Sequence, residues 1–220
     1  MAVRKIDRLY RPIQTSDSMT IHTVQAIRKI VLCISVAVGV FVFAVTTSIH
    51  PSGETPHEMI EWLGIVLIVV CILGRTWASL YIGGRKIEEF VQTGPYSVMR
   101  NPLYFFSFLG AAGVGMQVGS VAVGLICAVL TWVVFYVVVR QEEQVLEGRY
   151  GDSYRSYLMR VPRFLPKPSL WRDEPTLTIR PPRVLVTFAD ALVFLLAVPL
   201  AEFFEHLQET GVIPVLLRLP

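Results

Sequence analysis

Two short polar segments at the ends of long apolar runs carry the residues best suited to chemistry. Residues 94–104 read Gly-Pro-Tyr-Ser-Val-Met-Arg-Asn-Pro-Leu-Tyr, and residues 140–143 read Arg-Gln-Glu-Glu. Charges in such places are costly unless they are paired, which makes them candidates for function. One carboxylate of the second segment could pair with Arg100 or Arg75, and the other could accept hydrogen bonds from an ammonium group or from sugar hydroxyls.

The Asn101-Pro102 pair is typical of a helix start. Asparagine is a good N-cap, and proline fits the first helical position because its missing N–H would be unpaired there anyway. Backbone N–H groups of the first turn, together with Arg100, would then form a site for a carboxylate or a phosphate. A plain helix cap beside an arginine that binds lipid headgroups is the alternative.

Composition indicates a membrane protein of several spans. Of 220 residues, 53% are hydrophobic and only 17% are charged, with a mean hydropathy of +0.55. Soluble domains rarely have this balance. No basic strip interleaved with aromatic residues suggests nucleic acid as a partner. The three cysteines lie far apart in apolar runs and the four histidines in separate segments, so no metal site is expected.

Long apolar runs predict an all-α, polytopic fold with four to five transmembrane helices. Residues 30–49, 60–82, 103–116 and 121–139 form four spans, and the short connection 117–120 implies a tight helical hairpin. Residues 184–204 either span the membrane or lie in its interface, since Asp190 and Pro199 interrupt them. We favour a span.

Positive charge predicts the orientation. Lysine and arginine number six in residues 1–29, three in 83–101 and nine in 140–183, but none in loops 50–61 and 117–120. By the positive-inside rule the basic segments face the cytoplasm, as in a bacterial inner membrane or its equivalent. The predicted divisions are a cytoplasmic segment 1–29, a membrane core 30–166, a Pro-rich linker 167–183 and a C-terminal helix and tail 184–220.

Apolar and aromatic residues continue at helical spacing beyond the fourth span. This stripe comprises Val145, Leu146, Tyr150, Tyr154, Tyr157 and Leu158. It predicts a cytoplasmic helix that folds back onto loop 83–101, or a helix lying on the bilayer with its tyrosines as anchors. Arg75, near the inner end of the second span, either extends to headgroups or pairs with a carboxylate.

Together these motifs resemble the isoprenylcysteine carboxyl methyltransferase and phospholipid methyltransferase superfamily, whose members are integral membrane enzymes that use S-adenosylmethionine. The matching positions, all between residues 62 and 166, are Arg75, Trp77, Gly83, Gly94, Pro95, Tyr96, Arg100, Asn101, Pro102, Tyr104, Glu142, Glu143, Leu146, Tyr150, Gly151, Tyr154, Tyr157, Arg163 and Pro166. Asn101 stands where the family usually has histidine. Asparagine can cap a helix but supplies no titrating imidazole.

The resemblance implies S-adenosylmethionine as the cofactor and a lipophilic or lipid acceptor taken from the bilayer. The residues it assigns to cofactor binding are Gly94, Pro95, Tyr96, Arg100, Asn101, Pro102, Tyr104, Glu142, Glu143, Leu146, Tyr154 and Tyr157. Those it assigns to catalysis are Arg100, Glu142, Arg75 and Arg163. In this hypothesis Tyr96, Tyr104 and Tyr154 pack against the adenine or the sulfonium, and Arg75 or Arg163 orients a substrate carboxylate.

Two other functions stay open. A membrane reductase of the sterol type shares the Arg-x-Pro-x-Tyr segment but uses NADPH, and a non-catalytic scaffold or lipid-binding protein could keep the fold. The Glu-Glu-x-x-Leu continuation favours the methyltransferase. A carboxylate acceptor needs an arginine and no base, whereas a protonated amine needs a base such as Glu143, and this sequence offers both.

Overall fold

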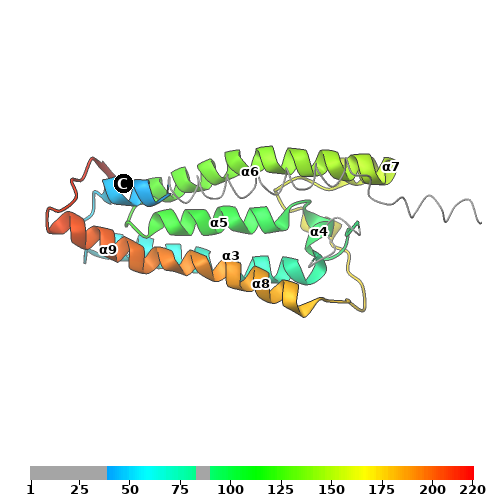
Figure 1. Cartoon of the computed structure of the whole chain (residues 1–220), viewed down its shortest axis with the longest axis horizontal. Helices are drawn as coiled ribbons and strands as arrows, with labels where there is room; N and C mark the ends of the chain where they lie inside the picture. Colours follow the sequence, from blue (N-terminus) through cyan, green and yellow to red (C-terminus); the bar gives the residue numbers. More distant parts are fainter. Residues whose placement is uncertain (1–38, 83–89) are drawn as a thin grey trace, which may run out of the picture.

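The computed structural model describes residues 39–82 and 90–220, and most of these residues are helical (Figure 1). The elements, in chain order, are β1 (Thr46–Ser48), α3 (Thr55–Ile82), α4 (Pro95–Val98), α5 (Pro102–Met116), α6 (Val121–Tyr150), α7 (Asp152–Arg160), η1 (Pro168–Leu170), α8 (Pro181–Leu192), η2 (Val193–Leu196), α9 (Ala197–Glu209) and β2 (Leu217–Leu219). Helices α3, α5, α6 and the α8–α9 unit lie along one long axis, with α4 and α7 at one end. The all-α prediction is confirmed.

Three helical segments within the described residues are long and apolar enough to cross a membrane. They are Thr55–Ile82, Val121–Tyr150 and Pro181–Glu209. Helix α5 is apolar but has 15 residues, about 22 Å at 1.5 Å per residue. The predicted spans 60–82, 103–116 and 121–139 therefore all occur as helices.

The prediction of a helix over residues 30–49 holds only in part. Residues 30–38 lie outside the described part of the chain, and residues 39–45 are helical. Residues 46–48 instead form strand β1, which pairs in parallel with β2 near the C-terminus. Threonine at positions 46 and 47 is β-branched and suits a strand, and the partner that makes the pairing possible lies about 170 residues away.

The C-terminal segment 184–204 belongs to a longer helical unit with a tightened turn in the middle. Helices α8 and α9 are joined by η2, so the chain stays helical from Pro181 to Glu209. Pro199 has no N–H to donate to Leu195, and its ring crowds that carbonyl, which accounts for the 3₁₀ turn just before it. Its length and apolarity suit a membrane crossing.

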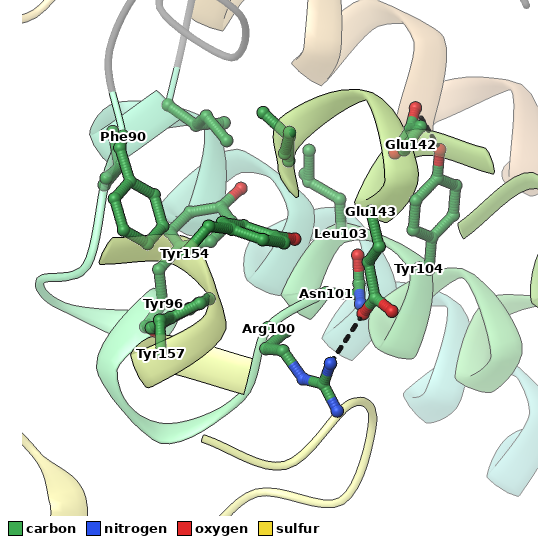
Figure 2. Close-up of a pocket in the computed structure, with 13 residues that line it drawn as sticks. Phe90, Tyr96, Arg100, Asn101, Leu103, Tyr104, Glu142, Glu143, Tyr154 and Tyr157 are labelled. Atoms are coloured by element: carbon green, nitrogen blue, oxygen red, sulfur yellow. Dashed lines mark hydrogen bonds and ion pairs between the residues drawn. The ribbon is translucent and has the colours of Figure 1, made fainter. Parts of the chain in front are cut away.

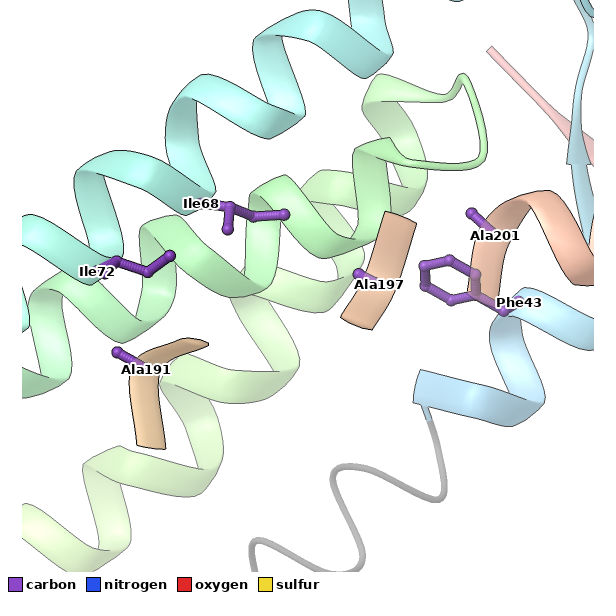
Figure 3. Packing of buried hydrophobic residues seen from close by; sticks show 6 residues of the cluster. All are labelled: Phe43, Ile68, Ile72, Ala191, Ala197 and Ala201. Carbon is purple, nitrogen blue, oxygen red and sulfur yellow. The ribbon is translucent and has the colours of Figure 1, made fainter. Parts of the chain in front are cut away.

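Small residues let α3 and α5 approach each other closely. A Cβ atom at Gly113 would overlap the carbonyl oxygen of Gly64, and one at Gly110 would overlap the thiol of Cys71. Such contacts are the usual means of helix packing in membranes. The C-terminal unit completes the core through a cluster shown in Figure 3, made of Phe43, Ile68, Ile72, Ala191, Ala197 and Ala201.

The predicted tight hairpin joins α5 to α6 through residues 117–120. Gly119 has φ +68°, and a Cβ atom there would overlap the imidazole ring of His57. Its carbonyl accepts a hydrogen bond of 2.7 Å from Ser48 Oγ, and Ser120 caps α6 by accepting from Val123 N. The hairpin is therefore packed against α3 and β1 at the end of the molecule opposite α4 and α7.

We expect Gly119→Ala to destabilise the protein by more than the roughly 1–2 kcal/mol of left-handed backbone strain, because the new methyl group must also displace His57. Thermal unfolding in detergent micelles would measure the loss. Gly211→Ala is the matched control, since Gly211 has φ +74° with open space around its Cβ position. Equal losses in both variants would show that the His57 contact is unimportant.

Candidate functional site

A pocket opens where the ends of α3, α4, α5, α6 and α7 meet. Its lining comprises Ile82, Phe90, Val91, Tyr96, Arg100, Asn101, Leu103, Tyr104, Glu142, Glu143, Leu146, Tyr154 and Tyr157. The rings of Phe90, Tyr96, Tyr154 and Tyr157 gather on one side, while Glu143, Glu142 and Tyr104 lie on the other (Figure 2). The two polar segments, some forty residues apart in sequence, thus form one site at one end of the bundle.

Glu143 sits between two arginines. Its carboxylate accepts a hydrogen bond of 3.0 Å from Arg100 Nη1. It accepts two more from Arg163, of 2.8 Å from Nη2 and 3.1 Å from Nε. The side chains of Glu143, Arg100 and Arg163 are 9%, 13% and 25% exposed. These hydrogen bonds raise the pKa of Arg163. A carboxylate of this segment was expected to pair with Arg100 or Arg75; Glu143 pairs with Arg100, and Arg163 joins the pair.

Glu142 turns toward a different part of the pocket. Its carboxylate accepts a hydrogen bond of 2.9 Å from the Tyr104 hydroxyl. The negative charge of Glu142 also acts on the neighbouring Tyr96 hydroxyl. Tyr96 is 5% exposed, and among the described residues its hydroxyl has no hydrogen-bond partner. Burial is the main cause that raises the pKa of Tyr96, so this hydroxyl stays protonated and can donate or accept.

Aromatic rings form the opposite wall. The Phe90 ring lies 5.2 Å from that of Tyr154 and 5.0 Å from that of Tyr157, and the Tyr157 hydroxyl donates 2.8 Å to the carbonyl of Tyr96. Both tyrosines are 3% exposed. Burial raises their pKa values, which keeps both hydroxyls neutral. A flat, neutral surface of this kind suits a planar ring system.

The predicted cytoplasmic helix folds back as expected, but through a break. Helix α6 continues beyond Arg140 to Tyr150, and Gly151 (φ +55°, ψ −129°) then turns the chain into α7. The prediction of one helix from Val145 to Leu158 is wrong at Gly151. Residues with a side chain rarely adopt this backbone conformation, which glycine allows. Because Tyr154 and Tyr157 are buried against Phe90, the alternative of tyrosines anchored in lipid does not describe them.

Asn101 stands at the expected N-cap position, with Pro102 first in α5. Its side chain makes no cap hydrogen bond, contrary to expectation. The amide Nδ2 instead donates 3.3 Å to the carbonyl of Arg163. This contact draws Asn101 toward the segment after α7, and it is a tertiary interaction that spacing within residues 94–104 could not reveal.

Nine of the twelve residues predicted to bind the cofactor line the pocket. Gly94, Pro95 and Pro102 do not, and they shape the backbone behind it. Of the predicted catalytic residues, Arg100 and Glu142 line the pocket, Arg163 holds Glu143 from outside, and Arg75 donates to Ser107 Oγ between α3 and α5.

Sequence reasoning missed four lining residues, Ile82, Phe90, Val91 and Leu103. Phe90 had a usable signal, because it is an aromatic residue in a polar loop that follows a membrane span. Ile82 and Leu103 are ordinary apolar residues at helix ends. Nothing in their pattern distinguishes them from residues that face lipid.

Gly94 lets its loop pack directly on α3. It has φ +57° and ψ −134°, and a Cβ atom there would overlap the ring of Tyr81. We expect Gly94→Ala to shift the loop that carries Tyr96 and Arg100 and to weaken ligand binding at the pocket. Gly151→Ala is a close control, since Gly151 has nearly the same backbone conformation with no atom near its Cβ position.

Ligand binding to the two glycine variants, measured side by side in lipid nanodiscs, tests this prediction. Strained backbone is common to both, so a defect confined to Gly94→Ala would come from the contact with Tyr81. If both variants bound ligand as the wild type does, the close approach of this loop to α3 would have no part in forming the site.

Comparison with known proteins shows the family to which this protein belongs. Residues 59–153 match the sequence model of the phospholipid methyltransferase family. A curated relative, the protein-S-isoprenylcysteine O-methyltransferase of Schizosaccharomyces pombe, is 29% identical over 42% of this chain and 40% of its own length. The chain belongs to the superfamily of isoprenylcysteine carboxyl methyltransferases and phospholipid methyltransferases. Its apolar helices and this family together indicate a membrane protein.

Two bacterial relatives match more of the chain. The cobalt-zinc-cadmium resistance protein CzcN of Cupriavidus metallidurans is 33% identical over 76% of this chain and 77% of its own length. The nickel-cobalt-cadmium resistance protein NccN of Alcaligenes xylosoxydans xylosoxydans is 32% identical over 72% and 74%. No solved structure matches this chain significantly.

Proposed function

We propose that the protein is an S-adenosylmethionine-dependent membrane methyltransferase that acts on a lipid-like or isoprenoid acceptor at a carboxylate. The observation that carries the proposal is the pocket at the end of the bundle, where an aromatic wall faces the Glu142–Tyr104 pair and the Arg100–Glu143–Arg163 cluster. Family membership supports the reaction class. The apolar helices around the pocket support an acceptor that comes from the bilayer.

The residues present fit S-adenosylmethionine. Its adenine would lie against Phe90 and Tyr154, and its ribose hydroxyls or ammonium group would be bound by Glu142, whose carboxylate lies at the pocket beside the Tyr104 hydroxyl. The unpaired, buried hydroxyl of Tyr96 offers a further polar contact. The bound cofactor would supply an electrophilic methyl group on a positively charged sulfur.

This chain's contribution is to position the reactants and exclude water. The rings of Phe90, Tyr154 and Tyr157 shield the pocket from one side, and water exclusion protects a reactive sulfonium. Glu143 keeps Arg100 in a fixed orientation, so the positive charge of Arg100 is directed but partly compensated. The role of Arg100 is then to orient the carboxylate of the cofactor or acceptor rather than to neutralise its charge fully.

Arg75 supports a carboxylate acceptor. Its guanidinium contacts Ser107 inside the helix bundle, and its positive charge acts on the Tyr96 hydroxyl at the pocket. We assign the orientation of the acceptor to Arg75, because its charge acts at the pocket, whereas Arg163 holds Glu143 through two nitrogens. A carboxylate acceptor needs no proton removed, which agrees with Asn101 in place of histidine.

The orientation we propose places this end of the bundle in the cytoplasm, where S-adenosylmethionine is made. The support is the distribution of lysine and arginine, with nine in residues 140–183 and none in 117–120. Accessibility labelling of cysteines introduced at Gln92 and Ser52, which lie at opposite ends, would test it in intact cells.

The decisive experiment for the activity is to identify the acceptor. Membranes would be incubated with the purified protein and methyl-labelled S-adenosylmethionine, and the lipid and protein fractions would be analysed by mass spectrometry. We expect label on an apolar molecule as a base-labile methyl ester. Base-stable label on an amine would exclude the carboxylate, and no transfer above a Glu142→Gln control would exclude the activity.

The two metal-resistance relatives suggest a physiological setting. We infer that the methylation alters a membrane component so that cells tolerate divalent transition metals better. A deletion strain carrying either the wild-type gene or Glu142→Gln would be grown with zinc, cobalt or cadmium. Protection by the wild type alone would support this role, whereas equal protection by both would separate metal tolerance from methyl transfer.

A further inference from the structure

The length of the uncharged part of helix α6 indicates where the membrane boundary lies relative to the site. Residues 121–139 are uncharged and, at 1.5 Å per residue, cover about 28 Å, close to the thickness of a hydrocarbon core. The membrane boundary therefore falls near Arg140. Tyr136, one helical turn earlier, and Phe135 lie about 6–8 Å inside it by the same rise.

Residues 162–173, which we call the strap, return to this depth after α7. The guanidinium carbon of Arg163 lies 5.4 Å from the ring centroid of Tyr136. The ring of Phe164 lies 5.3 Å from that of Phe108 on α5, which in turn contacts Phe135 at 6.1 Å. The first part of the strap thus lies beside the apolar portions of α5 and α6.

The side chains that the strap turns outward are those of a membrane interface. Leu165 is 77% exposed although it follows Phe164 at hydrocarbon depth. Trp171, 46% exposed, stacks on Trp77 of α3 with ring centroids 5.8 Å apart. Tryptophan favours the headgroup level, and an exposed leucine at this depth meets acyl chains rather than water.

The strap also holds the loop that carries Tyr96 and Arg100. Three backbone hydrogen bonds join the two segments. They run from Arg100 N to Pro162 O (2.9 Å), from Lys167 N to Val98 O (2.9 Å) and from Gly94 N to Arg172 O (2.7 Å). The Tyr81 hydroxyl adds a bond of 3.0 Å to Asp173 at the far end. Residues 94–100 are consequently fixed by backbone bonds to the strap along their whole length.

We propose that the strap is a lipid anchor: Phe164 and Leu165 insert among the acyl chains beside α5 and α6, Trp171 lies at the headgroups, and this anchorage holds residues 94–100 and Arg163 in place. The partner is the leaflet itself. The ordering of the site then depends on contact with the bilayer. This inference requires no particular reaction, so it stands or falls separately from the proposed activity.

Depth-dependent quenching tests the insertion directly. The full chain, with Cys33, Cys71 and Cys127 replaced by alanine, would carry a fluorophore at Leu165→Cys in vesicles of phosphatidylcholine and phosphatidylglycerol with brominated acyl chains. We expect a loss of fluorescence similar to that at Val133→Cys, a 49% exposed site on α6. The label at Asp152→Cys, whose side chain is 98% exposed, should respond to aqueous iodide instead.

Hydrogen exchange tests the consequence for the site. Leu165→Asp places a charge at hydrocarbon depth, and we expect backbone exchange in residues 94–100 to rise by about tenfold in vesicles as the loop opens locally. Ser169→Asp adds the same charge at an exposed polar position of the strap and should leave exchange unchanged. The proposal would be overturned if iodide quenched the fluorophore at residue 165, or if Leu165→Asp and wild type showed equal hydrogen exchange in residues 94–100. If neither iodide nor brominated lipid quenched the fluorophore, the surface would belong to a protein partner, and the proposal would be overturned too.

Discussion

Replacing Glu143 by alanine is expected to lower the stability of the protein by about 3–5 kcal/mol, the range found when one partner of a buried ion pair is removed. Glu143 is 9% exposed at its side chain and serves both Arg100 and Arg163. Its loss leaves two arginines facing each other without a carboxylate. The same change would release the strap, since Arg163 is one of its contacts with the core.

Thermal unfolding in nanodiscs would measure this loss. Glu143→Gln keeps the size of the side chain but removes the charge, so it should fall between wild type and alanine. Glu147→Ala is the control, because Glu147 pairs with Arg155 in a pair whose side chains are 36% and 63% exposed, and exposed pairs contribute little. A loss no larger than that of the control would contradict the cluster's structural role.

Glu142→Gln is expected to weaken cofactor binding while leaving stability nearly intact. Hydrogen bonds to a charged group contribute about 1.5–3 kcal/mol, which corresponds to roughly ten- to hundredfold in Kd. Glutamine can still accept from Tyr104, so the fold around the pair should survive. Effects on binding and on stability therefore separate at positions 142 and 143, although the two residues are adjacent.

Equilibrium binding of labelled S-adenosylmethionine to Glu142→Gln and to Tyr104→Phe would check this. Tyr104→Phe removes the hydroxyl that orients Glu142 but keeps its charge, so we expect a smaller loss of affinity than in Glu142→Gln. Equal binding by Glu142→Gln and wild type would remove the assigned role from Glu142.

Local chemistry explains why much of the site could be predicted from the sequence. Charges at the ends of apolar runs are costly unless they are paired, so the pattern predicted that a carboxylate of residues 142–143 pairs with Arg100 or Arg75, and only the structure shows the pair with Arg100. The Asn-Pro helix start followed in the same way. The helical spacing of Tyr154 and Tyr157 predicted that they face loop 83–101, and both contact Phe90 of that loop, even though Gly151 divides the helix.

Contacts between distant segments were beyond such reasoning. Whether Arg163 would orient a substrate or hold Glu143 depends on how the chain returns after α7, and several return paths satisfy the same pattern. The pairing of β1 with β2 joins residues about 170 positions apart, and strands of three residues carry little signal for register. Residues 167–183 were expected to be a Pro-rich linker, and proline content alone could not show that their first half binds residues 94–100.

The most direct measurement is calorimetric titration of the purified, full-length protein in nanodiscs with S-adenosylmethionine and, separately, with NADPH. We expect saturable binding of S-adenosylmethionine, competition by S-adenosylhomocysteine and no heat from NADPH. Saturable binding of NADPH in its place, or of neither compound, would contradict the assignment of this pocket to a methyl donor.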